Sequence, residues 1–223
     1  MKFGVARFPG SNCDQDAYYA IKDVLGQPVE YLWHQEADLK GADVVVIPGG
    51  FSFGDYLRCG AIARFAPVME AVQEHAAKGG IVIGICNGFQ ILCESRLLPG
   101  ALIRNDGQKF VCKHVSLRVE NTNTVFTRNA KPDQILSIPV AHGEGKYVCD
   151  DQLHDQLQAN GQILFRYASD DENPNGSIDN IAGIMNTGGN VFGMMPHPER
   201  ACDKALGSAD GLVLLGSLLN GRS

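Results

Sequence analysis

The sequence predicts an α/β protein with a mostly parallel central sheet and helices on both faces. Short apolar, β-branched segments alternate with amphipathic segments through the first half of the chain, as residues 43–47 and 81–85 illustrate. Strands that alternate with helices favour parallel pairing, because each intervening helix returns the chain to the same edge of the sheet. A glycine-flanked turn at residues 84–88 joins the second of these segments to a helical one, which is typical of a nucleophile elbow.

The elements of the first half follow from local composition. The predicted strands are apolar and end near Gly or Pro, and they comprise residues 2–7, 28–33, 43–47 and 81–85. The predicted helices carry apolar residues at helical spacing, and they comprise residues 13–25, 67–78 and 87–98. Ser11 or Asn12 is expected to cap the first helix, and Pro67 suits the first turn of the second.

The second half is richer in strands. We predict strands over residues 110–120, 134–140 and 161–167, an acidic loop over residues 170–177, a hairpin that joins residues 181–185 to residues 190–195, and a last helix over residues 207–219. There is no repeat, low-complexity tract or clear linker. The sequence therefore predicts a single domain over residues 1–223.

Composition excludes several function classes. The net charge of −6 and the lack of a basic stripe argue against nucleic acid or an anionic membrane surface as a partner. The apolar runs are far shorter than the roughly 20 residues that span a bilayer. No sorting signal is visible, so we expect a cytoplasmic protein. The seven cysteines include no Cys-x-x-Cys pair, so we expect neither a disulfide framework nor a metal site.

The sharpest local motif is Gly84-Ile85-Cys86-Asn87-Gly88. Glycines on both sides of a nucleophile relieve steric clashes in a cramped turn from strand to helix. The start of the following helix favours the thiolate form of Cys86, and the backbone N–H of Asn87 suits an oxyanion. A buried structural cysteine is the alternative, and the pentapeptide alone does not decide between the two.

A cysteine nucleophile requires a base, and His197 stands out among the six histidines. It lies in Met195-Pro196-His197-Pro198-Glu199-Arg200, directly after a predicted strand. Alternate residues of an extended segment share a face, so Glu199 can fix the His197 tautomer while the other ring nitrogen faces Cys86. We expect His34, His75, His114 and His154 at the surface because they lie in polar or helical contexts.

A second oxyanion donor is expected at the end of another strand. Pro48-Gly49-Gly50 follows residues 43–47, and glycines there allow the backbone to approach a ligand closely. An ordinary turn is the competing interpretation of this segment.

Taken together, these residues resemble class I (triad) glutamine amidotransferases. The elbow continues as Phe89-Gln90, and the His197 segment resembles the family's His-x-Glu motif. Motifs throughout the chain are similar to those of the glutaminase subunits of phosphoribosylformylglycinamidine synthase (the PurQ type), and they run over residues 8–14, 48–58, 141–145, 173–177 and 196–200. The long motif at residues 48–58 is specific, whereas the elbow is shared by all class I relatives. The resemblance implies a flavodoxin-like fold.

The resemblance also implies a mechanism. Cys86 would attack the glutamine carboxamide and form a thioester, His197 would transfer protons, and Glu199 would orient His197. The backbone N–H groups of Gly50 and Asn87 would form the oxyanion hole. Gln90, His142 and Gly143 would lie near the bound glutamine.

Ammonia would then pass through a tunnel to a large PurL-type synthetase subunit, with a small PurS-type third subunit in the complex. That partner would use ATP and magnesium to aminate formylglycinamide ribonucleotide in purine biosynthesis. The chain itself carries no G-x-x-x-x-G-K-[ST] phosphate loop, so no cofactor is expected in this subunit. Asp55, Tyr56 and Arg58 are candidates for sensing the partner, with simple loop packing as the alternative.

Three other functions compete with this one. The first is a cysteine hydrolase on the same elbow, against which the His197–Glu199 spacing argues. The second is an amidotransferase subunit for vitamin B6 or histidine synthesis, which residues 48–58 disfavour. The third is a non-catalytic protein on the same fold, which the intact Cys86 makes less attractive.

Overall fold

A nine-stranded sheet forms the centre of the molecule in the computed structural model, which describes residues 1–219. Its strands are β1 (Phe3–Arg7), β2 (Val29–Trp33), β3 (Val44–Ile47), β4 (Ile81–Ile85), β6 (Val111–Val119), β7 (Ile135–His142), β9 (Ile163–Tyr167), β10 (Ile181–Met185) and β11 (Val191–Met194). All of them were predicted to within two residues at each end. The short strands β5 (Ala101–Ile103) and β8 (Lys146–Val148), which form a separate two-stranded sheet, were not predicted.

The strand order places the site. Across the sheet the order is β2-β1-β3-β4-β11-β10-β9-β6-β7, and the first five strands pair in parallel. This parallel part has the 2-1-3-4-5 order of doubly wound, flavodoxin-like folds, in which ligands bind at the carboxyl ends of the strands near the reversal of order. The α/β class with a large parallel sheet is thus confirmed. The sheet continues from β11 through antiparallel pairs to β7.

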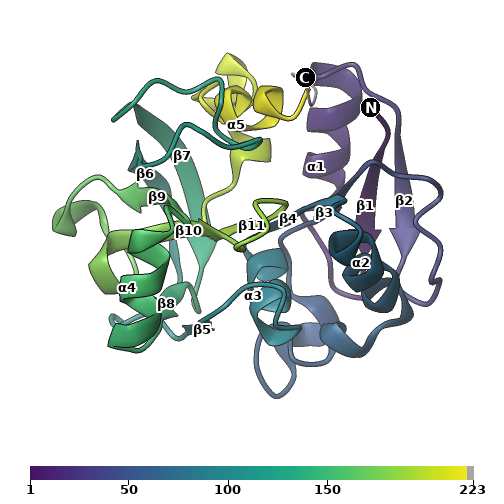
Figure 1. The fold of residues 1–223 in the computed structure, drawn as a ribbon, viewed down its shortest axis with the longest axis horizontal. Coiled ribbons are helices and arrows are strands. Elements are labelled where there is room, and N and C mark those ends of the chain that lie inside the picture. The colour runs from purple at the N-terminus through teal and green to yellow at the C-terminus, as the bar shows by residue number, and fades with distance from the viewer. Residues whose placement is uncertain (220–223) are drawn as a thin grey trace.

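Five α-helices surround this sheet in the described part of the chain: α1 (Asp14–Tyr19), α2 (Pro67–Ala77), α3 (Asn87–Glu94), α4 (Asp151–Ala159) and α5 (Gly211–Ser217). Figure 1 shows α1 and α5 above the central strands β4 and β11, and α3 below them. Side chains from both faces meet in one apolar core, in which Phe3, Ile83, Phe89 and Phe192 are fully buried. Within residues 1–219, none of the helices has the length and apolarity needed to cross a membrane.

The start of the first helix differs from the prediction. Neither Ser11 nor Asn12 caps it; Cys13 precedes α1 and makes no capping hydrogen bond through its side chain. The reason is that both polar side chains are used within the loop: the Ser11 hydroxyl accepts from the backbone N–H of Phe8, and Asn12 Oδ1 accepts from the thiol of Cys13. The helix then changes to a π-helical segment at Ala20–Val24 instead of continuing as one α-helix.

One histidine also lies elsewhere than predicted. His34 is buried rather than exposed, because its ring packs against those of Phe8, Trp33 and Phe53. His34 directly follows β2, and its ring contacts Phe53 in the loop that follows β3. The polar residues around His34 in the sequence did not indicate this burial.

Candidate active site

Cys86 occupies the turn between β4 and α3. Its backbone dihedrals, φ 52° and ψ −107°, lie in a region that non-glycine residues rarely adopt and that concentrates at functional sites. A Cβ on Gly88 would come within 1.9 Å of the carbonyl oxygen of Ile47, and one on Gly84 within 2.6 Å of the Gly88 oxygen. The flanking glycines are therefore required by backbone contacts, as expected for an elbow.

Cys86 is almost completely buried. The residue is 5% exposed, and its sulfur lies 3.7 Å from the carbonyl oxygen of Ala141. Asn87 begins α3, so its backbone N–H lacks an intrahelical acceptor. The Asn87 side chain accepts from the N–H of Ser52 at 3.1 Å and donates to Gln90 Oε1 at 2.9 Å, which holds the elbow to the neighbouring loop and to the next turn of the helix.

The structure places His197 and Glu199 together in the interior. Each is 1% exposed, and His197 Nδ1 lies 2.7 Å from Glu199 Oε1. The pairing does not come from a continuous extended segment, since Pro198–Arg200 forms a 3₁₀ turn that begins directly after His197. The other ring nitrogen, Nε2, is buried without a hydrogen-bond partner within the described chain. That nitrogen is the one available for Cys86 or for its substrate.

Charge and burial act in opposite directions on His197. Burial alone would lower its pKa, but the negative charges of Glu199 and Cys86 outweigh burial, and the pKa is raised well above its usual value. A positively charged imidazole beside a cysteine can activate that nucleophile and supply a proton to a leaving group.

Two glycines close the site from the side of β3. A Cβ on Gly49 would come within 2.8 Å of His197 Cε1 and 3.3 Å of Cys86 Cβ, so only glycine leaves room for both groups. Gly50 has φ 144° and lines the same cavity as Cys86. Its backbone is held by an isolated bridge to Ser11. The turn predicted at residues 48–50 thus lies against the reacting groups.

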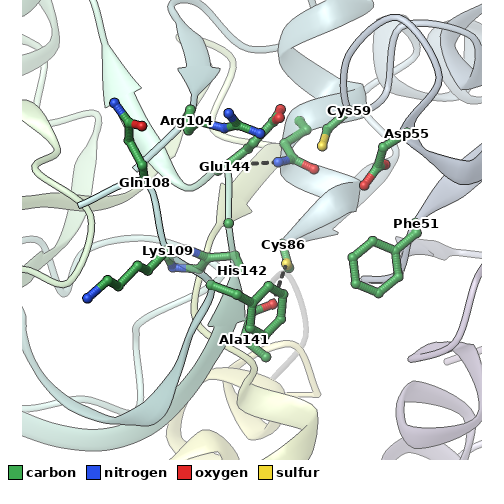
Figure 2. A pocket seen from close by; sticks show the side chains of 14 residues that line it. Phe51, Asp55, Cys59, Cys86, Arg104, Gln108, Lys109, Ala141, His142 and Glu144 are labelled. Carbon is green, nitrogen blue, oxygen red and sulfur yellow. Dashed lines mark hydrogen bonds between the residues drawn. The ribbon is translucent and has the colours of Figure 1, made fainter. Parts of the chain in front are cut away.

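A cavity of about 270 Å³ leads from the surface to Cys86. Figure 2 shows Cys86 at its floor, with Phe51 and Asp55 on one side and Lys109 on the other. Gln90, His142 and Gly143, which sequence similarity assigned to the substrate, all line this cavity. The structure therefore brings Cys86, Gly50, Gln90, His142 and Gly143 to this cavity. The buried His197–Glu199 pair lines a second cavity, which shares Ala141 with the first, and Asn87 holds the elbow through its side chain.

The two polar side chains predicted near the substrate are already engaged. Gln90 Nε2 donates to the carbonyl oxygen of Glu144 at 2.6 Å, which ties α3 to the loop after β7. His142 is 3% exposed, and Nε2 lies 3.4 Å from Asn175 Nδ2. Burial and the charge of His197 lower the pKa of His142 to about 4, so it is neutral near pH 7.

Sequence reasoning missed the charged groups at the mouth of the cavity. Asp55, Cys59 and Glu144 form a cluster there, in which burial and the neighbouring Glu144 carboxylate raise the pKa of Asp55. Asp55 Oδ1 is buried without a hydrogen-bond partner within the described residues. Arg104 and Lys109 supply positive charge to the same mouth. The sequence placed Asp55 beside the site but suggested only a contact with a partner protein or simple loop packing for it.

One group of side chains in residues 1–219 has the composition of a metal site. The ligand atoms of Cys13, His197 and Glu199 lie within 4.8 Å of one another. However, His197 and Glu199 already bond to each other, and Arg200 donates to the sulfur of Cys13 at 3.1 Å. Ligation of a cation would have to displace both contacts and bring the metal beside the Arg200 charge, so we interpret the group as a hydrogen-bonded cluster.

Comparisons with known proteins point in one direction. Residues 1–209 match the family model of the CobB/CobQ-like glutamine amidotransferase domain. The chain is 58% identical, over 98% of its own length and 97% of the relative's, to the phosphoribosylformylglycinamidine synthase subunit PurQ of Nostoc sp. (strain PCC 7120 / SAG 25.82 / UTEX 2576).

Solved structures agree with the sequence comparison. The structure of PurLQS from Thermotoga maritima contains a chain that superposes with a TM-score of 0.89 at 43% identity, covering 98% of this chain and 97% of that one. A glutamine amidotransferase from Thermotoga maritima superposes with a TM-score of 0.58 at 17% identity, covering 89% of this chain and 76% of that one, and shares the fold.

Proposed function

The chain belongs to the CobB/CobQ-like glutamine amidotransferase family, and from that premise we propose how its residues release ammonia from glutamine. It is a glutaminase subunit of the phosphoribosylformylglycinamidine synthase type. We assign catalysis to Cys86, His197 and Glu199. The observation that carries this assignment is the buried His197–Glu199 pair, whose ring lies beside the strained Cys86, both of them against Gly49.

The reaction follows from these positions. The Cys86 thiolate attacks the glutamine carboxamide carbon, and the backbone N–H groups of Gly50 and Asn87 stabilise the oxyanion. His197 protonates the departing nitrogen, and ammonia leaves a γ-glutamyl thioester on Cys86. His197 then takes a proton from water as the water attacks the thioester, which releases glutamate and restores the thiolate. Glu199 holds the imidazole throughout and stabilises its positive charge.

The mouth of the cavity suits the other end of glutamine. A free α-amino acid carries an ammonium and a carboxylate on the same carbon. We assign the ammonium to Asp55 and Glu144, because the unpartnered Asp55 oxygen requires a donor, and the carboxylate to Arg104 and Lys109. Gln90, His142 and Gly143 line the same cavity as these charges and Cys86, and we propose that they contact the side chain of glutamine.

We further propose the surroundings in which the chain works. Residues 1–223 form one glutaminase domain, since a single sheet contains strands from Phe3 to Met194. The chain needs no cofactor of its own and delivers ammonia to a large PurL-type synthetase subunit, which uses ATP and magnesium, with a small PurS-type subunit in the complex. The presence of a similar chain in the Thermotoga maritima PurLQS structure supports these partners.

The test is glutamate release from glutamine by the purified chain, alone and with the large and small subunits, formylglycinamide ribonucleotide and ATP. We expect slow release alone and a large increase in the full mixture, with no release from Cys86→Ala in either condition. Release that is equal for wild type and Cys86→Ala would refute the assigned nucleophile. Release that ignores the added subunits would refute the partners but not the glutaminase chemistry.

A further inference from the structure

Cys13 belongs to the same enclosed cluster as the reacting groups. It precedes α1, is 3% exposed, and donates its backbone N–H to the carbonyl oxygen of Gly49 at 3.3 Å. Its sulfur lies 3.1 Å from the point that a Cβ on Gly49 would occupy, and His197 Cε1 lies 2.8 Å from the same point. The Cys13 thiol is therefore a neighbour of the His197 ring, on the side where Gly49 has no side chain.

The sulfur of Cys13 is fixed by polar partners. Arg200 donates to it through a terminal guanidinium nitrogen at 3.1 Å, and the thiol lies 3.2 Å from Asn12 Oδ1. Arg200 is in turn held by Asp16, whose carboxylate accepts from Nε at 2.9 Å. A guanidinium is an unusual partner for a buried thiol that only fills space, since such cysteines behave as small hydrophobic groups. The Arg200 contact therefore indicates that the position of this sulfur matters.

His197 needs a second support. Glu199 bonds only Nδ1, and a ring held at one nitrogen can still rotate and tilt about that bond. The Cε1 edge of the ring faces Gly49, which has no side chain to make a polar contact with it. Building on the function proposed above, we propose that Cys13, held by Arg200, is a positioning residue that fixes the His197 imidazole in the orientation facing Cys86.

The same contact has an electrostatic consequence. The titratable groups that face His197 are Glu199 on its own segment, Cys86 at the elbow, Cys13 before α1, and the neutral His142 at the end of β7. Cys13 acts together with Glu199 and Cys86 in raising the pKa of His197. Removing the thiol therefore lowers that pKa, whereas a purely space-filling role leaves it unchanged.

The test compares Cys13→Ala, Cys13→Ser and Arg200→Met with the control Cys93→Ala. Cys93 is also a buried cysteine, but its sulfur contacts the carbonyl oxygen of Pro99 instead of the site. The first readout is the titration of the His197 imidazole by ¹⁵N NMR, which needs neither glutamine nor a partner. The second is the pH dependence of kcat and KM for glutamate release in the full complex.

We expect the His197 midpoint to move to lower pH in Cys13→Ala and to stay near that of wild type in Cys13→Ser and Cys93→Ala, because a serine hydroxyl still accepts from Arg200. Arg200→Met also removes a positive charge near His197, which acts on the midpoint in the opposite direction, so this variant is judged by kcat. We expect kcat to fall about tenfold in Cys13→Ala and in Arg200→Met, with KM within about twofold of wild type. Misplacement of a catalytic group predicts this pattern. An unchanged kcat in Arg200→Met, or equal effects of Cys13→Ser and Cys13→Ala, would overturn the proposal even if Cys13→Ala folds poorly. If wild type releases no glutamate, the proposed function fails while the NMR titration still decides the role of Cys13.

Discussion

Replacing Gly88 with alanine tests whether the elbow geometry is essential. The added Cβ would lie 1.9 Å from the carbonyl oxygen of Ile47, whereas real Cβ contacts are essentially never under 3.0 Å. The backbones must therefore separate by about 1.1 Å at least. Because Ile47 pairs with Gly84 across β3 and β4, this displacement acts directly on the turn that holds Cys86.

The magnitude has two opposing contributions. Overpacking costs about 1–3 kcal/mol, and a rigid carbonyl places this contact at the upper end. Alanine regains up to about 1 kcal/mol of helix propensity, because Gly88 lies in α3. The expected net loss is about 2 kcal/mol, or a Tm lower by about 4–8 °C for a chain of this length. A shift of about 1 Å in a reacting group predicts about a 100-fold lower kcat.

The assay is a thermal melt together with steady-state glutamate release in the full complex. Gly107→Ala is the matched control, since a Cβ there meets nothing within 4 Å and its φ is not positive. We expect this control to retain wild-type stability and activity. A Gly88→Ala variant with wild-type Tm and kcat would refute the argument that backbone contact at Gly88 holds Cys86 in its strained position.

Four further outcomes follow from the site. Cys86→Ser should abolish glutamine-dependent synthesis in the assembled complex and retain ammonia-dependent synthesis, and loss of both would contradict the separation of glutaminase from synthetase. His197→Ala should lower kcat/KM more than Glu199→Gln, because Glu199 orients and does not transfer protons; the reverse order would contradict these roles. Asp55→Asn should raise KM for glutamine about tenfold with a smaller effect on kcat, as loss of one hydrogen bond to a charged group predicts, and an unchanged KM would exclude Asp55 from the ammonium site. Because the folded pKa of His142 is about 4 against 6.5 for the free side chain, the unfolded chain binds the extra proton between these values. The contribution of His142 to the free energy of unfolding should therefore fall by about 3 kcal/mol between pH 6.5 and 4 and stay constant below pH 4. Urea unfolding of wild type and His142→Gln over this pH range checks this. The same pH dependence of the unfolding free energy in both proteins would refute it.

The sequence was sufficient for the elements whose signals are local. β3 and β4 are short β-branched runs between turns, and α2 has Pro67 in its first turn and buries Val68, Met69 and Val72 on one face. These patterns result directly from burial against a sheet, so composition alone predicts them. The glycines around Cys86 are equally local, because the clash they avoid is set by the elbow itself.

The elements that were missed have weak local signals. α4 is a nearly polar helix in which only Leu157 is buried, so its apolar stripe is too sparse to stand out. Its start is fixed by Asp150, whose carboxylate accepts from the N–H of Leu153 at 2.8 Å. The three-residue strands β5 and β8 are too short for alternation to be visible. The charged mouth of the cavity was missed for a different reason: Asp55 and Glu144 are distant in sequence and meet only in the folded chain.

The position of His197 depends on strand order, which residue spacing does not give. The last strand, β11, inserts beside β4 in parallel, with Met194 opposite Ile85. Cys86 follows Ile85 directly, and its backbone N–H donates to the Met194 carbonyl oxygen at 2.8 Å. His197 comes three residues after Met194, and its N–H donates to the carbonyl oxygen of Pro139 in β7 at 2.8 Å, which holds the segment against β7.

Two residues separated by more than a hundred positions therefore meet because their strands are neighbours in register. A slip of one residue between β4 and β11 would reverse the face on which the His197 segment leaves the sheet. Parallel pairing places the carboxyl ends of β4 and its neighbour at the same edge of the sheet. It does not determine which strand is that neighbour, and the sequence does not show that it is β11. The motifs identify Cys86 and His197 as the reacting residues, and the pairing of β11 with β4 brings the two residues together.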